Sequence, residues 1–224
     1  MILELHAHSK YSFDSMAKPR KILEAAIKAG LDGIAITDHN TIRGAVETAT
    51  INQNPKFQVI IGTEIASDAG DIVGLFLSDE IRARKYMEVI DEIHRQNGIA
   101  VLPHPYKGHR LIDEMIRNID LIEGINARTS MEDNNKAIEL ARRFDKPIIA
   151  GSDAHFLWEI GRCRVAIESN DIRQALLEGK ISLQTALTPR YFLNASQIIK
   201  SVKKHKYHKI PFQVAKLAKN YIFE

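Results

Sequence analysis

Short apolar runs alternate with amphipathic segments along most of this 224-residue chain, and that alternation restricts the fold more than any other feature. The runs are mostly continuous Ile, Val, Leu and Ala stretches, which are typical of strands buried on both faces of a parallel sheet. A further strand at Asp71–Leu77 is expected to pair with the strand before it. The seven main strands are expected at Ile2–His6, Gly33–Thr37, Gln58–Glu64, Ile99–Pro103, Leu121–Asn126, Pro147–Ser152 and Cys163–Ile167.

The segments between these runs carry helix signals. Pro19 suits the first turn of a helix, and Gly30 suits its C-terminal cap. Similar amphipathic patterns cover Lys85–Gln96 and Glu132–Phe144. Strands that alternate with helices predict right-handed crossover connections and a parallel sheet, either open or closed into a barrel.

Potential metal ligands follow six consecutive strands of this pattern. Because the C-terminal ends of parallel strands share one rim, we expect these side chains to meet there. A lone loop histidine is more often a surface residue, but five of the nine histidines occupy such positions. Imidazole and oxygen donors suit zinc, manganese or iron, and their number predicts two or three divalent ions. The side chains are His6 and His8, Asp38 and His39, Glu64, His104, Asn126, and Asp153 and His155.

The overall composition excludes several classes of protein. No run approaches the roughly 18 apolar residues that span a bilayer, and the N-terminus lacks the pattern of a secretory signal. The single Cys163 excludes an intramolecular disulfide and a thiolate-rich metal site. We therefore expect a cytoplasmic protein that does not bind membranes.

Five motifs in combination resemble the PHP family, a metal-dependent phosphoesterase domain named for polymerases and histidinol phosphatases. They are "HAHSKYSFD", "ITDHN", "GTE", "PHP" at 103–105 and "GSDAH", and the resemblance runs from His6 to about Ile167. It implies an α/β fold, a distorted seven-stranded TIM-like β/α barrel, with three ions at the C-terminal rim of the strands.

The resemblance also implies which residues bind each ion. One ion would be held by His6, His8, Glu64 and Asp153. Glu64 would bridge to a second ion held by His104 and Asn126, and a third would be held by Asp14, His39 and His155. The candidate catalytic residues are Glu64, as the bridging ligand, and Asp38, which orients a neighbouring ligand or caps the next helix.

Such a centre points to phosphate ester hydrolysis, because clustered divalent ions outweigh the ligand carboxylates and attract anions. We expect a metal-activated hydroxide, bridging the Glu64-linked pair, to attack phosphorus. Arg128 is the best placed phosphate-binding candidate, since a guanidinium binds phosphate in bidentate fashion. Weaker substrate-binding candidates are Lys10, Arg43, Lys107 and Arg110, together with Tyr106 in the loop "HPYKGHR".

The chain is expected to divide into a barrel, residues 1–190, and a basic helical segment, residues 191–224, that packs on the barrel or extends from it. Residues 190–224 hold Arg190 and seven lysines against Glu224 alone. The leading interpretation is a phosphatase or phosphoesterase for a small molecule or nucleotide. The basic segment leaves open a nuclease or oligonucleotide phosphoesterase that binds nucleic acid. A non-catalytic, metal-stabilised module and a hydrolase of C–N bonds are further alternatives, and the oligomeric state stays open.

Overall fold

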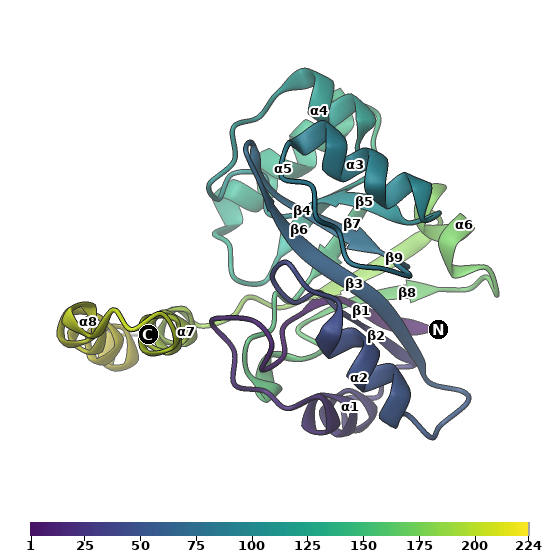
Figure 1. Ribbon diagram of the computed structural model, residues 1–224. Coiled ribbons are helices and arrows are strands. Elements are labelled where there is room, and N and C mark those ends of the chain that lie inside the picture. Colours follow the sequence, from purple (N-terminus) through teal and green to yellow (C-terminus); the bar gives the residue numbers. More distant parts are fainter. Residues whose placement is uncertain (224) are drawn as a thin grey trace.

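One sheet forms the centre of the molecule in the computed structural model, which describes residues 1–223 (Figure 1). Its strands follow the order β7-β6-β5-β4-β3-β2-β1-β8-β9, and the sheet curls into a nearly closed barrel. The strands are β1 Ile2–Ala7, β2 Gly33–Ile36, β3 Gln58–Ser67, β4 Gly70–Leu75, β5 Ile99–Leu102, β6 Leu121–Asn126, β7 Ile148–Gly151, β8 Cys163–Ile167 and β9 Ile181–Thr185.

The six strands that precede the candidate ligands all run in the same direction. β1, β2 and β3 pair in parallel, as do β5, β6 and β7. β4 lies between β3 and β5 and is antiparallel to both, which confirms the expected local pairing of the Asp71–Leu77 segment with the strand before it. The C-terminal ends of the six strands therefore lie on one rim of the barrel.

The sheet departs from the expected seven parallel strands, because the described residues form nine strands in a mixed sheet. β8 runs antiparallel to β1, and β9 runs antiparallel to β8. Only a 3₁₀ turn, Leu157–Glu159, separates β7 from β8, and this connection is too short for a helical crossover. β9 was missed because its five residues, "ISLQT", alternate only briefly between apolar and polar.

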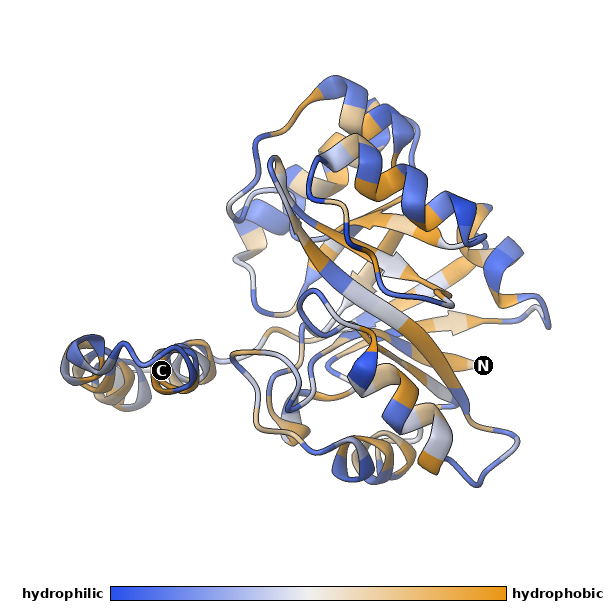
Figure 2. Cartoon of the chain, viewed as in Figure 1, coloured by the Kyte–Doolittle hydropathy of each residue, from blue (hydrophilic) through white to orange (hydrophobic). Residues whose placement is uncertain are grey.

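Helices cover the outside of the sheet, and hydrophobic residues lie along the strands and on the helices (Figure 2). The buried side chains of these residues pack together between the two layers. In α1, Pro19 occupies the first turn as expected, and Ile22, Leu23 and Ala26 are buried. No helix within residues 1–223 is both long and apolar enough to cross a membrane. These helices are α1 Pro19–Lys28, α2 Arg43–Ile51, α3 Tyr86–Arg95, α4 Asp113–Asn118, α5 Met131–Arg143 and α6 Ile172–Leu177.

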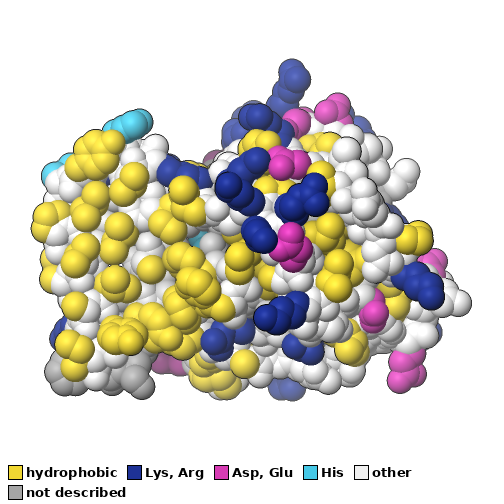
Figure 3. Space-filling model, turned by 90° about the horizontal axis from the view of Figure 1, so that it is seen from below, with side chains coloured by type: hydrophobic (Ala, Val, Ile, Leu, Met, Phe, Trp, Pro, Cys, Tyr) yellow, Lys and Arg dark blue, Asp and Glu magenta, His cyan; other side chains and the backbone are white. Residues whose placement is uncertain are grey.

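The C-terminal segment forms a helical hairpin that projects from the ligand-bearing side of the barrel (Figure 1). It consists of α7, Arg190–Lys203, a 3₁₀ turn at Tyr207–Lys209, and α8, Ile210–Phe223, which packs on α7. Apolar side chains gather on one face of this hairpin (Figure 3), and Phe212 is 76% exposed. The division of the chain near residue 190 stays a prediction.

Candidate metal centre

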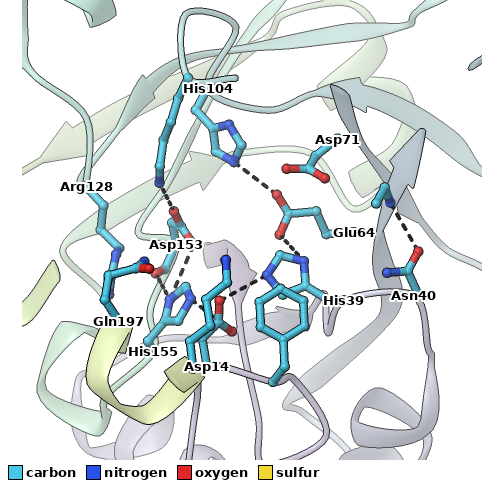
Figure 4. Close-up of a pocket in the computed structure, with 14 residues that line it drawn as sticks. Asp14, His39, Asn40, Glu64, Asp71, His104, Arg128, Asp153, His155 and Gln197 are labelled. Carbon is cyan, nitrogen blue, oxygen red and sulfur yellow. Dashed lines mark hydrogen bonds and ion pairs between the residues drawn. The ribbon is translucent and has the colours of Figure 1, made fainter. Parts of the chain in front are cut away.

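A cavity of about 250 Å³ opens at the rim where the six parallel strands end (Figure 4). Most of the expected ligands line it, and α7 contributes Gln197 and Lys200 to its wall. The complete lining is Phe13, Asp14, His39, Asn40, Glu64, Ala66, Asp71, His104, Lys107, Arg128, Asp153, His155, Gln197 and Lys200.

Four side chains, which we name the first ligand group, point their ligand atoms at one another. His6 Nε2 lies 3.2 Å from His8 Nε2 and 3.6 Å from Glu64 Oε2. Asp153 Oδ1 lies 3.2 Å from His8 Nε2 and 3.8 Å from His6 Nε2. Ligands of a tetrahedral zinc ion lie about 3.4 Å from one another, because each is about 2.0–2.2 Å from the metal. The donors and their spacing therefore fit one divalent cation.

Buried partners fix the orientation of both imidazoles. His6 Nδ1 lies 3.0 Å from Glu123 Oε1, and His8 Nδ1 lies 3.0 Å from Ser12 Oγ. Such contacts leave Nε2 free to bind a metal and set its direction. Glu123 also accepts a hydrogen bond from the backbone N–H of His104, at 2.9 Å, so one carboxylate positions two candidate ligands.

The backbone at the strand ends is shaped for this centre. Asp153 and His104 have φ values of 50° and 29°, in a region that non-glycine residues adopt rarely and mostly at functional sites. Gly151, at the end of β7, has no room for a side chain, because a Cβ there would overlap the Glu123 carboxylate and His6. Strand packing and ligand placement are therefore linked.

A second ligand group consists of Glu64, His104 and Asp71. Glu64 Oε1 lies 3.0 Å from His104 Nε2, while its other oxygen faces the first group. Ligand atoms of the three residues lie within 4.8 Å of one another. The expected ligand Asn126 is not brought into the cavity, because its amide oxygen accepts from the backbone N–H of Arg128 at 2.9 Å.

The third ligand group is Asp14, His39 and His155. The two Asp14 carboxylate oxygens lie 3.3 Å from His39 Nε2 and 3.3 Å from His155 Nε2, respectively. His39, His155 and His8 also bring nitrogen atoms within 4.8 Å of one another. The three residues come from loops that follow β1, β2 and β7, and the fold brings them together as expected.

Carboxylates around the cavity hold protons on two of the histidines. Burial lowers the pKa of His39, but Glu64 and Asp14 outweigh burial and raise that pKa to about 9. Burial also lowers the pKa of His6, and Glu123 raises it well above its usual value. Both imidazoles hold a proton more strongly than a free histidine does, so a cation that binds through them must compete with protons.

The neighbouring ligands are already deprotonated at neutral pH. Burial and the nearby charge of His155 lower the pKa of His8 to about 4. Burial raises the carboxyl pKa of Asp153, but Lys107 and the histidines hold it well below its usual range. The same balance of burial and histidine charge keeps Glu64 ionised. These groups are ready to bind a cation without loss of a proton.

Comparison with known families agrees with this arrangement. The model of the PHP domain matches residues 4–151, and the model described as PHP-associated matches residues 131–181. The chain belongs to the PHP family. The resemblance seen in the five sequence motifs is thus confirmed.

Relatives of this PHP protein include two uncharacterised proteins of Methanocaldococcus jannaschii. One is 40% identical over 144 residues, which span 57% of this chain and 82% of the relative. The other is 32% identical over 211 residues, which span 88% of this chain and 80% of the relative. A two-domain protein of Bacteroides vulgatus, described as containing a predicted PHP-like metal-dependent phosphoesterase, has the same fold. Its crystal structure gives a TM-score of 0.70 at 21% identity, over 83% of this chain and 65% of that one.

Asp38 and Arg128 have structural partners in this PHP domain. Asp38 is fully buried outside the cavity lining, and its carboxylate accepts from the backbone N–H and the hydroxyl of Ser9, both at 2.6 Å. Arg128 lines the cavity, but its guanidinium donates to both carboxylate oxygens of Glu159, at 2.9 and 3.0 Å, and to Ser196 Oγ. Both residues therefore brace the loops that carry ligands.

The other predicted substrate contacts are scattered. Lys107 lines the cavity, and its Nζ lies 3.3 Å from Asp153 Oδ2. Lys10 instead pairs with Glu47, at 3.1 Å, and is absent from the cavity lining together with Arg43, Tyr106 and Arg110.

Sequence reasoning missed three contributions to the centre. Glu123 lies within the apolar strand β6, and a charged residue in a buried strand is itself a signal of a partner. Asp71 is the second residue of β4, whose reversed direction brings its first residues to the ligand rim. Nothing in the sequence indicated that α7 would form part of the cavity wall.

Proposed function

We propose that this PHP protein hydrolyses phosphate monoesters of a small molecule or nucleotide at a centre of three divalent cations. The observation that carries the proposal is the sharing of Glu64 among neighbouring ligand groups. One oxygen lies 3.0 Å from His104 Nε2, and the other lies 3.4 Å from His8 Nε2 and 3.2 Å from His39 Nδ1. A carboxylate in this position can hold cations close together, as in two-metal sites that hydrolyse phosphate esters.

The first, second and third ligand groups would each hold one ion. All three combine imidazole and carboxylate donors, which fit zinc, manganese or iron. We assign Asp71 to the second ion in place of Asn126, because the Asp71 carboxylate lies close to Glu64 and His104. The Asn126 amide oxygen instead accepts a hydrogen bond from the backbone N–H of Arg128. Burial and the charge of Glu64 raise the pKa of Asp71, so a cation there would offset an existing repulsion.

The chain would supply binding and orientation for the phosphate. Bound cations would neutralise phosphate charge and lower the pKa of water at the centre. Lys107 and Lys200 place ammonium groups at the cavity wall, and Gln197 adds an amide. A cavity of about 250 Å³ accommodates a phosphate group with only part of its leaving group. The rest of the substrate would extend toward solvent past α7.

Activity measurements on metal-reconstituted protein test this proposal. Metal-stripped protein is loaded with Zn²⁺, Mn²⁺ or Fe²⁺ and assayed with p-nitrophenyl phosphate, nucleoside mono- and bisphosphates, sugar phosphates and an amide substrate. We expect phosphate release that chelation abolishes and metal restores. Activity on the amide alone would replace the proposal with C–N hydrolysis. Metal binding without any turnover would favour a non-catalytic module.

A groove beside the cavity favours oligonucleotides as a second substrate class. It shares Lys107, Arg128 and Gln197 with the cavity and continues along α7 and α8 past Asn194 and Lys216. This lining contains no carboxylate, so it suits the further phosphates of a nucleic acid chain. We expect Lys216→Gln to weaken binding of a short single strand and reduce its salt dependence, without changing p-nitrophenyl phosphate turnover. Equal affinity of both proteins would remove this candidate.

A further inference from the structure

Helix α7 of the C-terminal hairpin is connected, directly or through one or two intervening side chains, to every residue of the third ligand group. The sequence presents this helix as part of a basic tail, yet its last turn lies against the loop after β1. Three separate sets of contacts, one for each ligand, connect α7 to Asp14, His39 and His155.

Lys203 fixes the loop that carries Asp14. Its Nζ donates hydrogen bonds to the backbone carbonyl oxygens of Lys10, Ser12 and Ser15, at 2.8, 2.7 and 2.6 Å. An ammonium group has three donors, and this one uses all of them on a single loop. Asp14 lies between two of the three bound carbonyls, so the position of its carboxylate depends on α7.

A chain of hydrogen bonds connects α7 to His155. Ser196, on α7, accepts a hydrogen bond from Arg128, whose guanidinium pairs with Glu159. Glu159 in turn accepts from the backbone N–H groups of His155 and Phe156, at 2.8 and 2.9 Å. Arg128 and Glu159 are both buried, which makes this connection stiff.

Aromatic stacking connects α7 to His39. The Phe13 ring stacks on the His39 ring with 4.2 Å between centroids and an angle of 2° between planes. The ammonium groups of Lys204 and Lys200 lie 3.7 and 4.7 Å from the centre of the same Phe13 ring. Cation–π attraction thus holds Phe13 between His39 and the helix.

The first ligand group is held differently. Glu123, on β6, orients His6, and Glu4, on β1, accepts from the backbone N–H of Ser152 beside Asp153. Both carboxylates are buried inside the barrel. Strands of the sheet thus support His6 and Asp153, whereas His8 is oriented by Ser12, whose carbonyl oxygen also accepts from Lys203.

We propose that α7 is part of the metal centre, and that Lys203 is a positioning residue which sets the affinity of the third ligand group for its cation. The inference rests on the three-ion assignment of the proposed function. It gives the basic C-terminal segment a role within the same chain. Because contacts outside the ligand sphere typically change metal affinity by about 10–100-fold, loss of Lys203 is expected to fall in that range.

Metal binding to the full chain tests the proposal. Metal-stripped wild type, Lys203→Met, Lys203→Arg and Lys209→Met are dialysed against graded Zn²⁺ or Mn²⁺, and bound ions are counted by mass spectrometry. Lys209 is an exposed lysine of the same segment, so its variant is matched in charge. We expect three ions in wild type and Lys209→Met. In Lys203→Met, one ion should become the weakest, bound about 10–100-fold less tightly than in wild type, while the other two are unchanged and Lys203→Arg recovers part of the loss.

A second variant covers the outcome in which Lys203→Met does not fold. Ser196→Ala removes one hydroxyl from the connection to His155 and should weaken the same ion selectively. Three ions bound by Lys203→Met with wild-type affinities would overturn the proposal, as would equal weakening of all three. Phosphatase activity with only two ions in wild type would retain the proposed hydrolysis of phosphate monoesters, and would overturn both the three-ion assignment and this inference. Three bound ions without phosphatase activity would retain this inference and overturn the proposed function.

Discussion

The first and third ligand groups share one cavity but are supported by different parts of the chain. His6 lies within β1 and Asp153 just after β7, and both are supported by carboxylates inside the barrel. Asp14, His39 and His155 lie on loops that α7 secures from outside. The difference implies two levels of rigidity in one centre: one cation site formed with the sheet, and one completed only when the C-terminal helix packs.

The largest effect is expected where the two groups meet. Glu64→Gln removes the charge that faces His8, His39 and His104, so the first and second ligand groups lose a carboxylate and His39 of the third group loses its neighbouring charge. We expect phosphatase activity to fall to background. Loss of a contact outside the ligand sphere weakens metal binding by up to about 100-fold, and the loss of this ligand should weaken it more. Metal titration with parallel assays measures both. Loss of only one ion would contradict a shared role for Glu64.

Glu123→Gln should weaken the first ligand group and leave the third unchanged, because Glu123 acts from inside the barrel. It weakens the partner that orients His6 and holds the His104 backbone, while α7 keeps its contacts. We expect metal affinity of the first ligand group to fall about 10–100-fold. The exposed Glu132→Gln, on α5, is the control and should match wild type. If Glu123→Gln selectively lost the same ion as Lys203→Met, the two ligand groups would not have separate supports.

The pH dependence of binding should sharpen the comparison further. His39 is protonated below its raised pKa of about 9, so a cation that binds there displaces a proton. Affinity of the third ligand group should therefore rise with pH from 6 to 9, by up to about tenfold per pH unit for one proton. Calorimetry at pH 7 in buffers of different ionisation enthalpy measures the protons released. Binding heats that do not depend on the buffer would contradict this charge assignment.

The two ligand groups were equally visible in the sequence, whereas their supports were not. Histidines and carboxylates at strand ends could be placed on one rim, because the six strands run in parallel. Glu123 left a weak signal, as a charged residue in an apolar strand. Asp71 required the direction of β4, which is a property of the hairpin rather than of the motif.

The contacts of α7 had no sequence signal at all. Lys203 binds backbone carbonyl groups, which every residue has, across about 190 positions of sequence, so no residue pattern marks the site of contact. The sequence predicted a basic helical segment that packs on the barrel or extends from it, and left nucleic-acid binding open, but it did not indicate which loops the segment contacts. Long-range contacts to the backbone are therefore the part of this centre that only the folded structure reveals.

The smallest effect is expected at Lys10, where side chain and backbone have separate roles. Its carbonyl accepts from Lys203, whereas its ammonium pairs with Glu47 at the surface. Surface ion pairs contribute little because solvent screens them, so Lys10→Met should change neither KM nor the affinity of the weakest ion by more than about twofold. Metal titration and steady-state kinetics beside Lys203→Met measure the contrast. A loss as large as that of Lys203→Met would show that charge at this edge, rather than the position of the Asp14 loop, governs the third ligand group.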